Sequence, residues 1–150
     1  MIRNSHAGFI ALMLSLAFLG CGSDGPEIAS VEGTITMDGE PLANASVLFV
    51  PTGGRPAAAR TDENGKYTLN FTAGRKGAML GKNVVRISTA ADPSETPDGE
   101  PIPAQPERVP MKYNATSELT FVVEAGKKNV ADFDITSEGP IAGADEALDN

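Results

Sequence analysis

The stretch "VEGTITMDGEPLANASVLFV", residues 31–50, decides the fold class. In its first seven residues the odd positions carry apolar side chains or Gly33, and the even positions carry glutamate or threonine. This alternation is typical of a β-strand with one buried face. The turn-forming residues 38–41 follow, and then a nearly continuous apolar run at 46–50. The pattern predicts two strands joined by a turn, the second of them central in its sheet.

Similar short segments recur along the rest of the chain, and helical periodicity is almost absent. Turn-forming residues separate them, as in sandwiches of immunoglobulin-like architecture. We therefore predict an all-β fold, a single antiparallel β-sandwich of about seven strands over residues 28–136. The further strand segments are 57–62, 66–71, 82–89, 117–124 and 130–136.

Two features refine this expectation. The turns "ENG", residues 63–65, and "AGKKN", residues 125–129, are expected to close hairpins, and Gly39 and Gly65 are expected to supply a positive φ in their turns. The phenylalanines of the strand segments all fall on the expected inward faces, so core packing explains them without a ligand. They are Phe49, Phe71, Phe121 and Phe133.

The chain begins with a short polar segment and an apolar run at residues 7–19, which is 13 residues long. A bilayer-spanning helix needs about 20 apolar residues, whereas a run of this length fits the central region of a secretory signal peptide. Residues 1–20 are therefore expected to be a signal peptide, and the protein to be exported. Residues 21–27, "CGSDGPE", are small and polar and are expected to form a flexible tether.

Cys21 is the only cysteine, so no disulfide can form within the chain. A catalytic thiol needs a base or a cationic neighbour, and the only histidine, His6, lies in the expected signal peptide. The segment "AFLGC" instead resembles the lipobox of bacterial lipoproteins. The resemblance implies a diacylglycerol, typically with palmitate, on Cys21 as a membrane anchor. Ordinary signal cleavage near Gly20 is the alternative.

Charge excludes some partners. The chain has a formal net charge of -8, and loss of Arg3 with the signal peptide leaves 11 basic and 20 acidic residues. Nucleic acid is excluded as a partner because its phosphates need a dense basic surface. The same average charge argues against docking on anionic lipid through basic residues.

Two segments depart from the strand pattern. Residues 90–110 contain six of the eleven prolines, and proline donates no ladder hydrogen bond, so this stretch is expected to be a long loop outside the sheets. It is either a functional loop or a polyproline-like one. Residues 137–150 are acidic and rich in small residues, and are expected to be a disordered tail.

Three motifs carry a family resemblance: "GTITMDGEPLANASVLF", "TDENGKYTL" and "MKYNATSELTFVVEAGKKNVADFDI". Together they resemble carboxypeptidase regulatory-like and Cna-B-like domains, and the small transthyretin-like lipoproteins of planctomycete-type bacteria. The resemblance covers residues 29–136 and implies a sandwich fold. The motifs consist of turn and core residues, so the resemblance implies no catalytic group.

Catalysis is not expected, and no cofactor is implied. The hydroxyisourate hydrolases of the transthyretin-related class use histidines, and the metallocarboxypeptidases hold zinc in a separate domain. A hydrolase of unknown type, using a carboxylate pair, stays as a lesser alternative. Asp62 and Asn64 in "TDENG" are weak candidates for a calcium loop, but the distal glutamate of an EF-hand is absent.

The remaining candidate contact is basic. Arg75, Lys76 and Lys82 lie close together in "GRKGAMLGK" and could bind an anion or a glycan. The sequence therefore predicts a non-catalytic lipoprotein facing the periplasm or the cell surface, with an envelope protein or a glycan as its partner. A carbohydrate-binding or small-ligand-binding lipoprotein is the main alternative.

Overall fold

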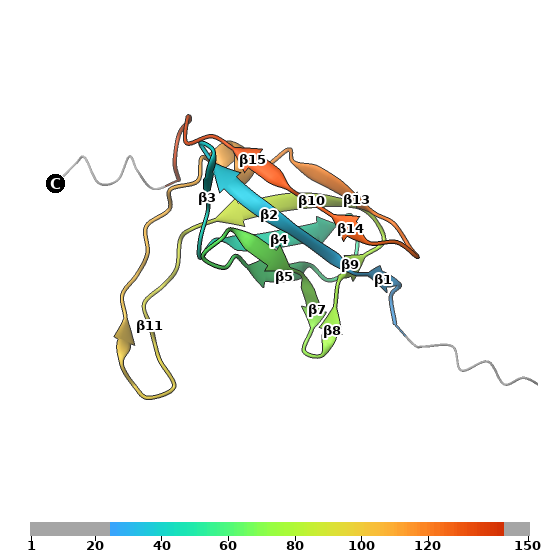
Figure 1. The fold of residues 1–150 in the computed structure, drawn as a ribbon, viewed down its shortest axis with the longest axis horizontal. Helices are drawn as coiled ribbons and strands as arrows, with labels where there is room; N and C mark the ends of the chain where they lie inside the picture. Colours follow the sequence, from blue (N-terminus) through green and yellow to red (C-terminus); the bar gives the residue numbers. More distant parts are fainter. Residues whose placement is uncertain (1–24, 143–150) are drawn as a thin grey trace, which may run out of the picture.

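The computed structural model describes residues 25–142, which form β-strands and one 3-10 helix (Figure 1). The elements are β1 (Ile28–Ala29), β2 (Val31–Met37), β3 (Glu40–Pro41), β4 (Ser46–Pro51), β5 (Ala57–Arg60), β6 (Lys66–Thr68), β7 (Asn70–Thr72), β8 (Arg75–Lys76), β9 (Ala78–Met79), β10 (Gly81–Ser88), β11 (Ser94–Glu95), β12 (Pro101–Ile102), η1 (Met111–Tyr113), β13 (Thr120–Val123), β14 (Asn129–Val130) and β15 (Phe133–Ile135). Within the described range no helix is long and apolar enough to cross a membrane. The all-β prediction is confirmed.

The larger sheet is antiparallel and has six strands in the order β13-β10-β4-β5-β7-β8. Its centre is the pairing of β4 with β10, in which Phe49 lies opposite Val85 and Val47 opposite Ile87. These four side chains are fully buried. The apolar run at 46–50 is therefore a central strand, as its composition predicts.

The second sheet is built on β2, which pairs with β3 and β6 in antiparallel fashion and with β14 and β15 in parallel. The chain after β13 thus crosses from the larger sheet to the smaller one. The hairpin expected around residues 125–129 is wrong, because β13 pairs with β10 and not with β14. The hairpin expected at 63–65 is wrong for a similar reason, since β5 pairs with β4 and β7 while β6 pairs with β2.

A break in one expected strand returns the chain from the smaller sheet to the larger one. The segment 66–71 splits at Leu69, where β6 in the smaller sheet ends and β7 in the larger sheet begins. Leu69 is fully buried, its N–H donates to the Val31 carbonyl at 3.0 Å, and its own carbonyl accepts from the Gly77 N–H at 2.8 Å. One continuous run therefore supplies strands to both layers, as at the corner of a closed sandwich.

The core lies between the two sheets and includes the expected phenylalanines. Phe49 is fully buried, and its ring centroid lies 5.9 Å from that of Phe121 and 6.5 Å from that of Phe133, both in edge-to-face geometry. Such pairs contribute about 0.5–1.5 kcal/mol each beyond the area that they bury. Phe71 is also buried, at 6% exposure. Core packing accounts for all four rings.

The proline-rich segment forms an arm, residues 91–105, that projects from the sandwich at the end away from β1 (Figure 1). Its two sides pair through β11 and β12 and through an isolated bridge between Ala91 and Gln105. The arm lies outside both sheets, as its prolines require. The chain returns to the core at Val109 and Pro110, which are buried.

Candidate functional site

A partly buried carboxylate, Glu107, fixes the base of the arm. Oε1 of Glu107 accepts the N–H groups of Thr89 at 2.8 Å and Val109 at 3.0 Å, and the Thr89 hydroxyl at 2.9 Å. Its Oε2 accepts the Ser88 hydroxyl at 2.5 Å and the side-chain amide of Asn114 at 2.8 Å. One side chain is thus hydrogen-bonded to the end of β10 and to the chain on both sides of the arm.

The environment of this carboxylate shifts its titration. Partial burial by itself raises the pKa of Glu107, but the hydrogen bonds from Ser88, Thr89 and Val109 outweigh burial and lower the pKa below its ordinary value. Glu107 is therefore a charged group whose oxygens are occupied by the protein's own donors. This bonding favours a structural role over proton transfer.

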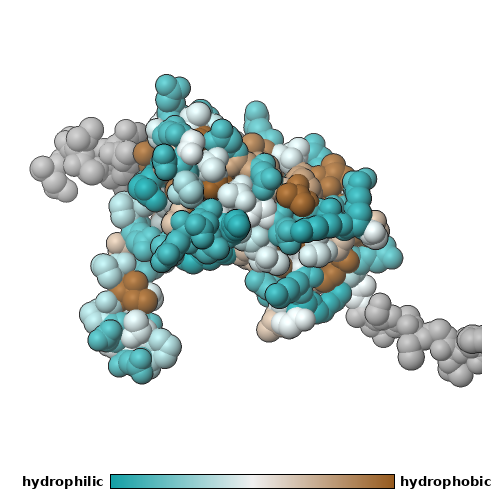
Figure 2. Space-filling view, viewed as in Figure 1, coloured by the Kyte–Doolittle hydropathy of each residue, from teal (hydrophilic) through white to brown (hydrophobic). Residues whose placement is uncertain are grey.

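The arm itself is exposed and acidic. Its surface is mostly hydrophilic (Figure 2), and its one exposed large apolar side chain among the described residues is Ile102, at 40% exposure. Its charged residues are all acids: Asp92, Glu95, Asp98 and Glu100. Prolines restrict its backbone, which lowers the entropy cost of binding a partner. These properties suit a contact surface.

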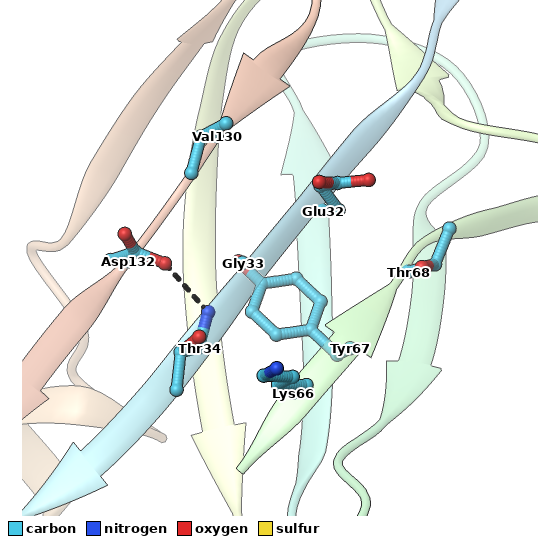
Figure 3. A pocket seen from close by; sticks show the side chains of 8 residues that line it. All are labelled: Glu32, Gly33, Thr34, Lys66, Tyr67, Thr68, Val130 and Asp132. Carbon is cyan, nitrogen blue, oxygen red and sulfur yellow. Dashed lines mark hydrogen bonds between the residues drawn. The ribbon is translucent and has the colours of Figure 1, made fainter. Parts of the chain in front are cut away.

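A second feature is a hollow of about 360 Å³ over the smaller sheet, where β2 passes between β6 and β14 (Figure 3). Polar side chains surround it, and Gly33 of β2 is among the residues that line it. The lining residues are Glu32, Gly33, Thr34, Lys66, Tyr67, Thr68, Val130 and Asp132.

The hollow arises where the parallel pairing of β14 and β15 with β2 is interrupted. Oδ1 of Asp132 accepts the Thr34 N–H at 2.7 Å, in place of a main-chain oxygen (Figure 3). The Tyr67 hydroxyl donates to the Ala131 carbonyl at 2.6 Å. Burial, and secondarily the negative charge of Asp132, raises the pKa of Tyr67 above its ordinary value. Tyr67 therefore stays neutral and acts as a hydrogen-bond donor to the fold.

The candidate calcium residues serve the turn between β5 and β6. Oδ1 of Asp62 accepts the N–H groups of Asn64 at 2.8 Å and Lys66 at 2.9 Å, so this oxygen already has two donors. No group of three or more His, Cys, Asp or Glu side chains that could hold a metal ion occurs in residues 25–142. The turn is explained by its own hydrogen bonds.

The three candidate basic residues lie in the part of the sandwich nearest the start of the described chain. Arg75 and Lys76 form β8, and Lys82 is the second residue of β10. The guanidinium of Arg75 lies 5.5 Å from the centroid of the Phe71 ring and donates to the Pro26 carbonyl at 3.3 Å. Cys21 and the expected signal peptide lie outside the described residues.

Some residues with structural roles at these sites were not singled out in the sequence. The sequence does not mark Glu107, because its hydrogen-bond donors at residues 88 and 89 lie almost twenty residues away in the chain. Asn129, which is 4% exposed, accepts the Glu124 N–H at 2.9 Å and donates to the carbonyls of Ser30 and Glu124. An asparagine after two lysines in a turn-rich segment gives no sign of such burial.

Comparisons with known proteins add little. No family model matches the chain, and no curated protein matches it. A crystal structure of a 9R-lipoxygenase from Cyanothece PCC8801 is similar over 73% of this chain and 16% of that chain, at 16% identity and a TM-score of 0.36. The chain thus spans about a sixth of that protein's length. A similarity of this extent assigns neither a family nor an activity.

Proposed function

We propose that this chain is a non-catalytic lipoprotein of the bacterial cell envelope, anchored through Cys21, whose sandwich is a protein-interaction module. The observation that carries the proposal is the arm, which Glu107 fixes at its base and which exposes four acids and Ile102. The resemblance to carboxypeptidase regulatory-like lipoproteins supports the same function. The partner is an envelope protein with a basic surface that complements the arm.

The anchor is tested by Cys21→Ala. We expect the variant to lose incorporation of labelled palmitate and to leave the membrane fraction, because alanine lacks the sulfur that would carry the lipid. Membrane fractionation and intact mass of the mature protein measure both effects. Ser23→Ala, a change of similar size two residues away, is the matched control and should be acylated normally. Undiminished palmitate incorporation in Cys21→Ala would refute the anchor.

The interaction is tested by capture of partners from native envelopes with the lipidated protein. Neutralising three acids of the arm, Glu95→Gln, Asp98→Asn and Glu100→Gln, should reduce recovery of a bound protein about ten-fold, because a complementary basic surface loses its counter-charges. The matched control neutralises three exposed acids away from the end that carries the arm: Glu27→Gln, Glu118→Gln and Glu124→Gln. Equal loss of the partner in both triple variants would contradict a role for the arm.

A second candidate function is the binding of a neutral saccharide or polyol in the hollow over β2. Two carboxylates, an ammonium group and two threonine hydroxyls line this hollow beside the aliphatic Val130, a set that suits hydroxyl groups better than a simple anion. If this candidate function is correct, the capture experiment should retain a glycan. Lys66→Ala should lose this glycan, and the variant with a neutralised arm should keep it.

A further inference from the structure

Six exposed basic residues lie at one end of the sandwich, which we call the cationic end. They come from the β4–β5 loop, from β8, from the start of β10 and from the turn between β13 and β14. The residues are Arg55, Arg75, Lys76, Lys82, Lys127 and Lys128. The strand pairings bring these segments to the same end, because Gly81 lies opposite Val123 and Asn83 opposite Pro51.

The cationic end surrounds the segment where the described chain begins. Arg75 and Pro26 are hydrogen-bonded and line a hollow of about 290 Å³ together with Ala125 and Gly126 of the β13–β14 turn. The β4–β5 loop is close to β9, since a Cβ on Gly54 would lie 2.6 Å from Sδ of Met79. β9 in turn pairs with β1. Three segments that are distant in the sequence, the β4–β5 loop, residues 75–82 and the β13–β14 turn, therefore meet around residues 25–28.

Basic and acidic residues are unevenly distributed along the sandwich, and the acids beside the basic residues of the cationic end are Glu27, Glu32 and Glu124. Lys127 pairs with Glu124, and Nζ of Lys128 lies 2.5 Å from Oε1 of Glu32. Within residues 25–142, no ion pair involves the other four basic residues of this end. The opposite end carries the acids of the arm and of the turns after β2 and β5, namely Asp38, Glu40, Asp62, Glu63, Asp92, Glu95, Asp98 and Glu100.

The proposed anchor would bring this end to the membrane. From Cys21 to Gly25 the chain advances by four residues, which covalent geometry limits to about 14 Å. Anionic lipids attract basic residues over about one Debye length, roughly 8 Å at physiological ionic strength. Charges on the surface that surrounds residues 25–28 can therefore reach the headgroups of the membrane that carries the acyl chains.

We propose that the cationic end docks on anionic phospholipid headgroups and so orients the anchored domain with its arm pointing away from the membrane. This inference rests on the proposed anchoring at Cys21. It revises the expectation, drawn from net charge alone, that basic residues would not contact anionic lipid. The average charge of the chain is negative, but at the cationic end six basic residues outnumber the acids Glu27, Glu32 and Glu124.

Orientation can be measured with the full lipidated protein in vesicles. The acylated Cys21 has no free thiol, so Thr52→Cys at the cationic end or Ser94→Cys in the arm introduces a unique labelling site. In vesicles containing about one third phosphatidylglycerol and a headgroup-attached nitroxide, a fluorophore at position 52 should be quenched at least about two-fold more than one at position 94. The triple variant Arg55→Glu, Lys76→Glu and Lys82→Glu should remove this difference, as should pure phosphatidylcholine vesicles.

The matched control reverses three basic residues away from this end: Arg86→Glu, Arg108→Glu and Lys112→Glu. It should keep the difference in quenching. Cosedimentation with vesicles and intact mass are recorded on the same samples. A protein that carries no acyl chain and does not cosediment refutes the anchor and the docking together. An anchored protein whose quenching is equal at both positions, or insensitive to the charge reversals and to lipid composition, refutes only the docking.

Discussion

Gly33→Ala is expected to destabilise the fold by about 3–5 kcal/mol, a large part of the stability of a small domain. A Cβ built on Gly33 lies 1.9 Å from the Ala131 carbonyl oxygen and 3.1 Å from Cε1 of Tyr67. The oxygen belongs to backbone and cannot rotate away. The Ala131 N–H donates to the Glu32 carbonyl at 2.8 Å, and its carbonyl accepts from Tyr67. The methyl group therefore forces apart β2 and the connection between β14 and β15.

Urea unfolding followed by circular dichroism measures this loss. Gly39→Ala is the matched control, because Gly39 has a φ of +83° and no atom within 4 Å of its Cβ position. That variant has only the cost of a left-handed backbone, about 1–2 kcal/mol. If Gly33→Ala were no more destabilising than Gly39→Ala, β14 and β15 would not pack over Gly33 as described.

The alternation in residues 31–37 correctly predicted the faces of β2, and the apolar run at 46–50 correctly predicted a central strand. Both predictions depend on local periodicity, which reports burial directly. The positive φ of Gly39 and Gly65 was also predictable, because turn chemistry is local. The sequence therefore specifies the elements and their inward faces well.

Local periodicity does not predict which strands pair with one another in a sheet. Period-two alternation tells which face of a strand is buried, but not which strand lies beside it. The turns at 63–65 and 125–129 look like hairpin turns, yet each leads the chain into the other sheet. From the sequence alone, Gly33 is one of several residues on the inward face of the strand at 31–37. Only a glycine fits at this position, because the backbone of Ala131, almost one hundred residues later, lies where a side chain would begin.

The candidate sites differ in the same respect. Arg75, Lys76 and Lys82 are neighbours in the sequence and could be singled out together. Their association with Arg55 and with the β13–β14 turn depends on the register of β10 against β4 and β13. In the same way, the sequence predicts that residues 90–110 leave the sheets, but not that they form a paired arm with a fixed base.

Glu107→Gln is expected to loosen the base of the arm and to lower stability at neutral pH by about 2–3 kcal/mol, since hydrogen bonds to a charged acceptor are among the stronger ones. The amide group retains one oxygen for the N–H groups of Thr89 and Val109, but its NH₂ cannot accept from Ser88 or Asn114. Hydrogen exchange should show reduced protection of the Thr89 and Val109 amides. Glu118→Gln is the control, because it removes an exposed carboxylate that makes no side-chain hydrogen bond within residues 25–142. It should leave the stability and the protection of both amides unchanged.

The pH dependence distinguishes the charge of Glu107 from its shape. The hydrogen bonds hold the pKa of the folded carboxyl group below its ordinary value of 4.5. The carboxylate therefore contributes stability that is fully present above that ordinary value and is lost as pH falls through the lower, folded pKa. The stability difference between wild type and Glu107→Gln should stay constant from pH 7 down to near the ordinary pKa of 4.5, and shrink as the pH falls further through the folded pKa. A difference that stayed constant below pH 4.5 as well would mean that Glu107 supports the arm through packing and not through its charge.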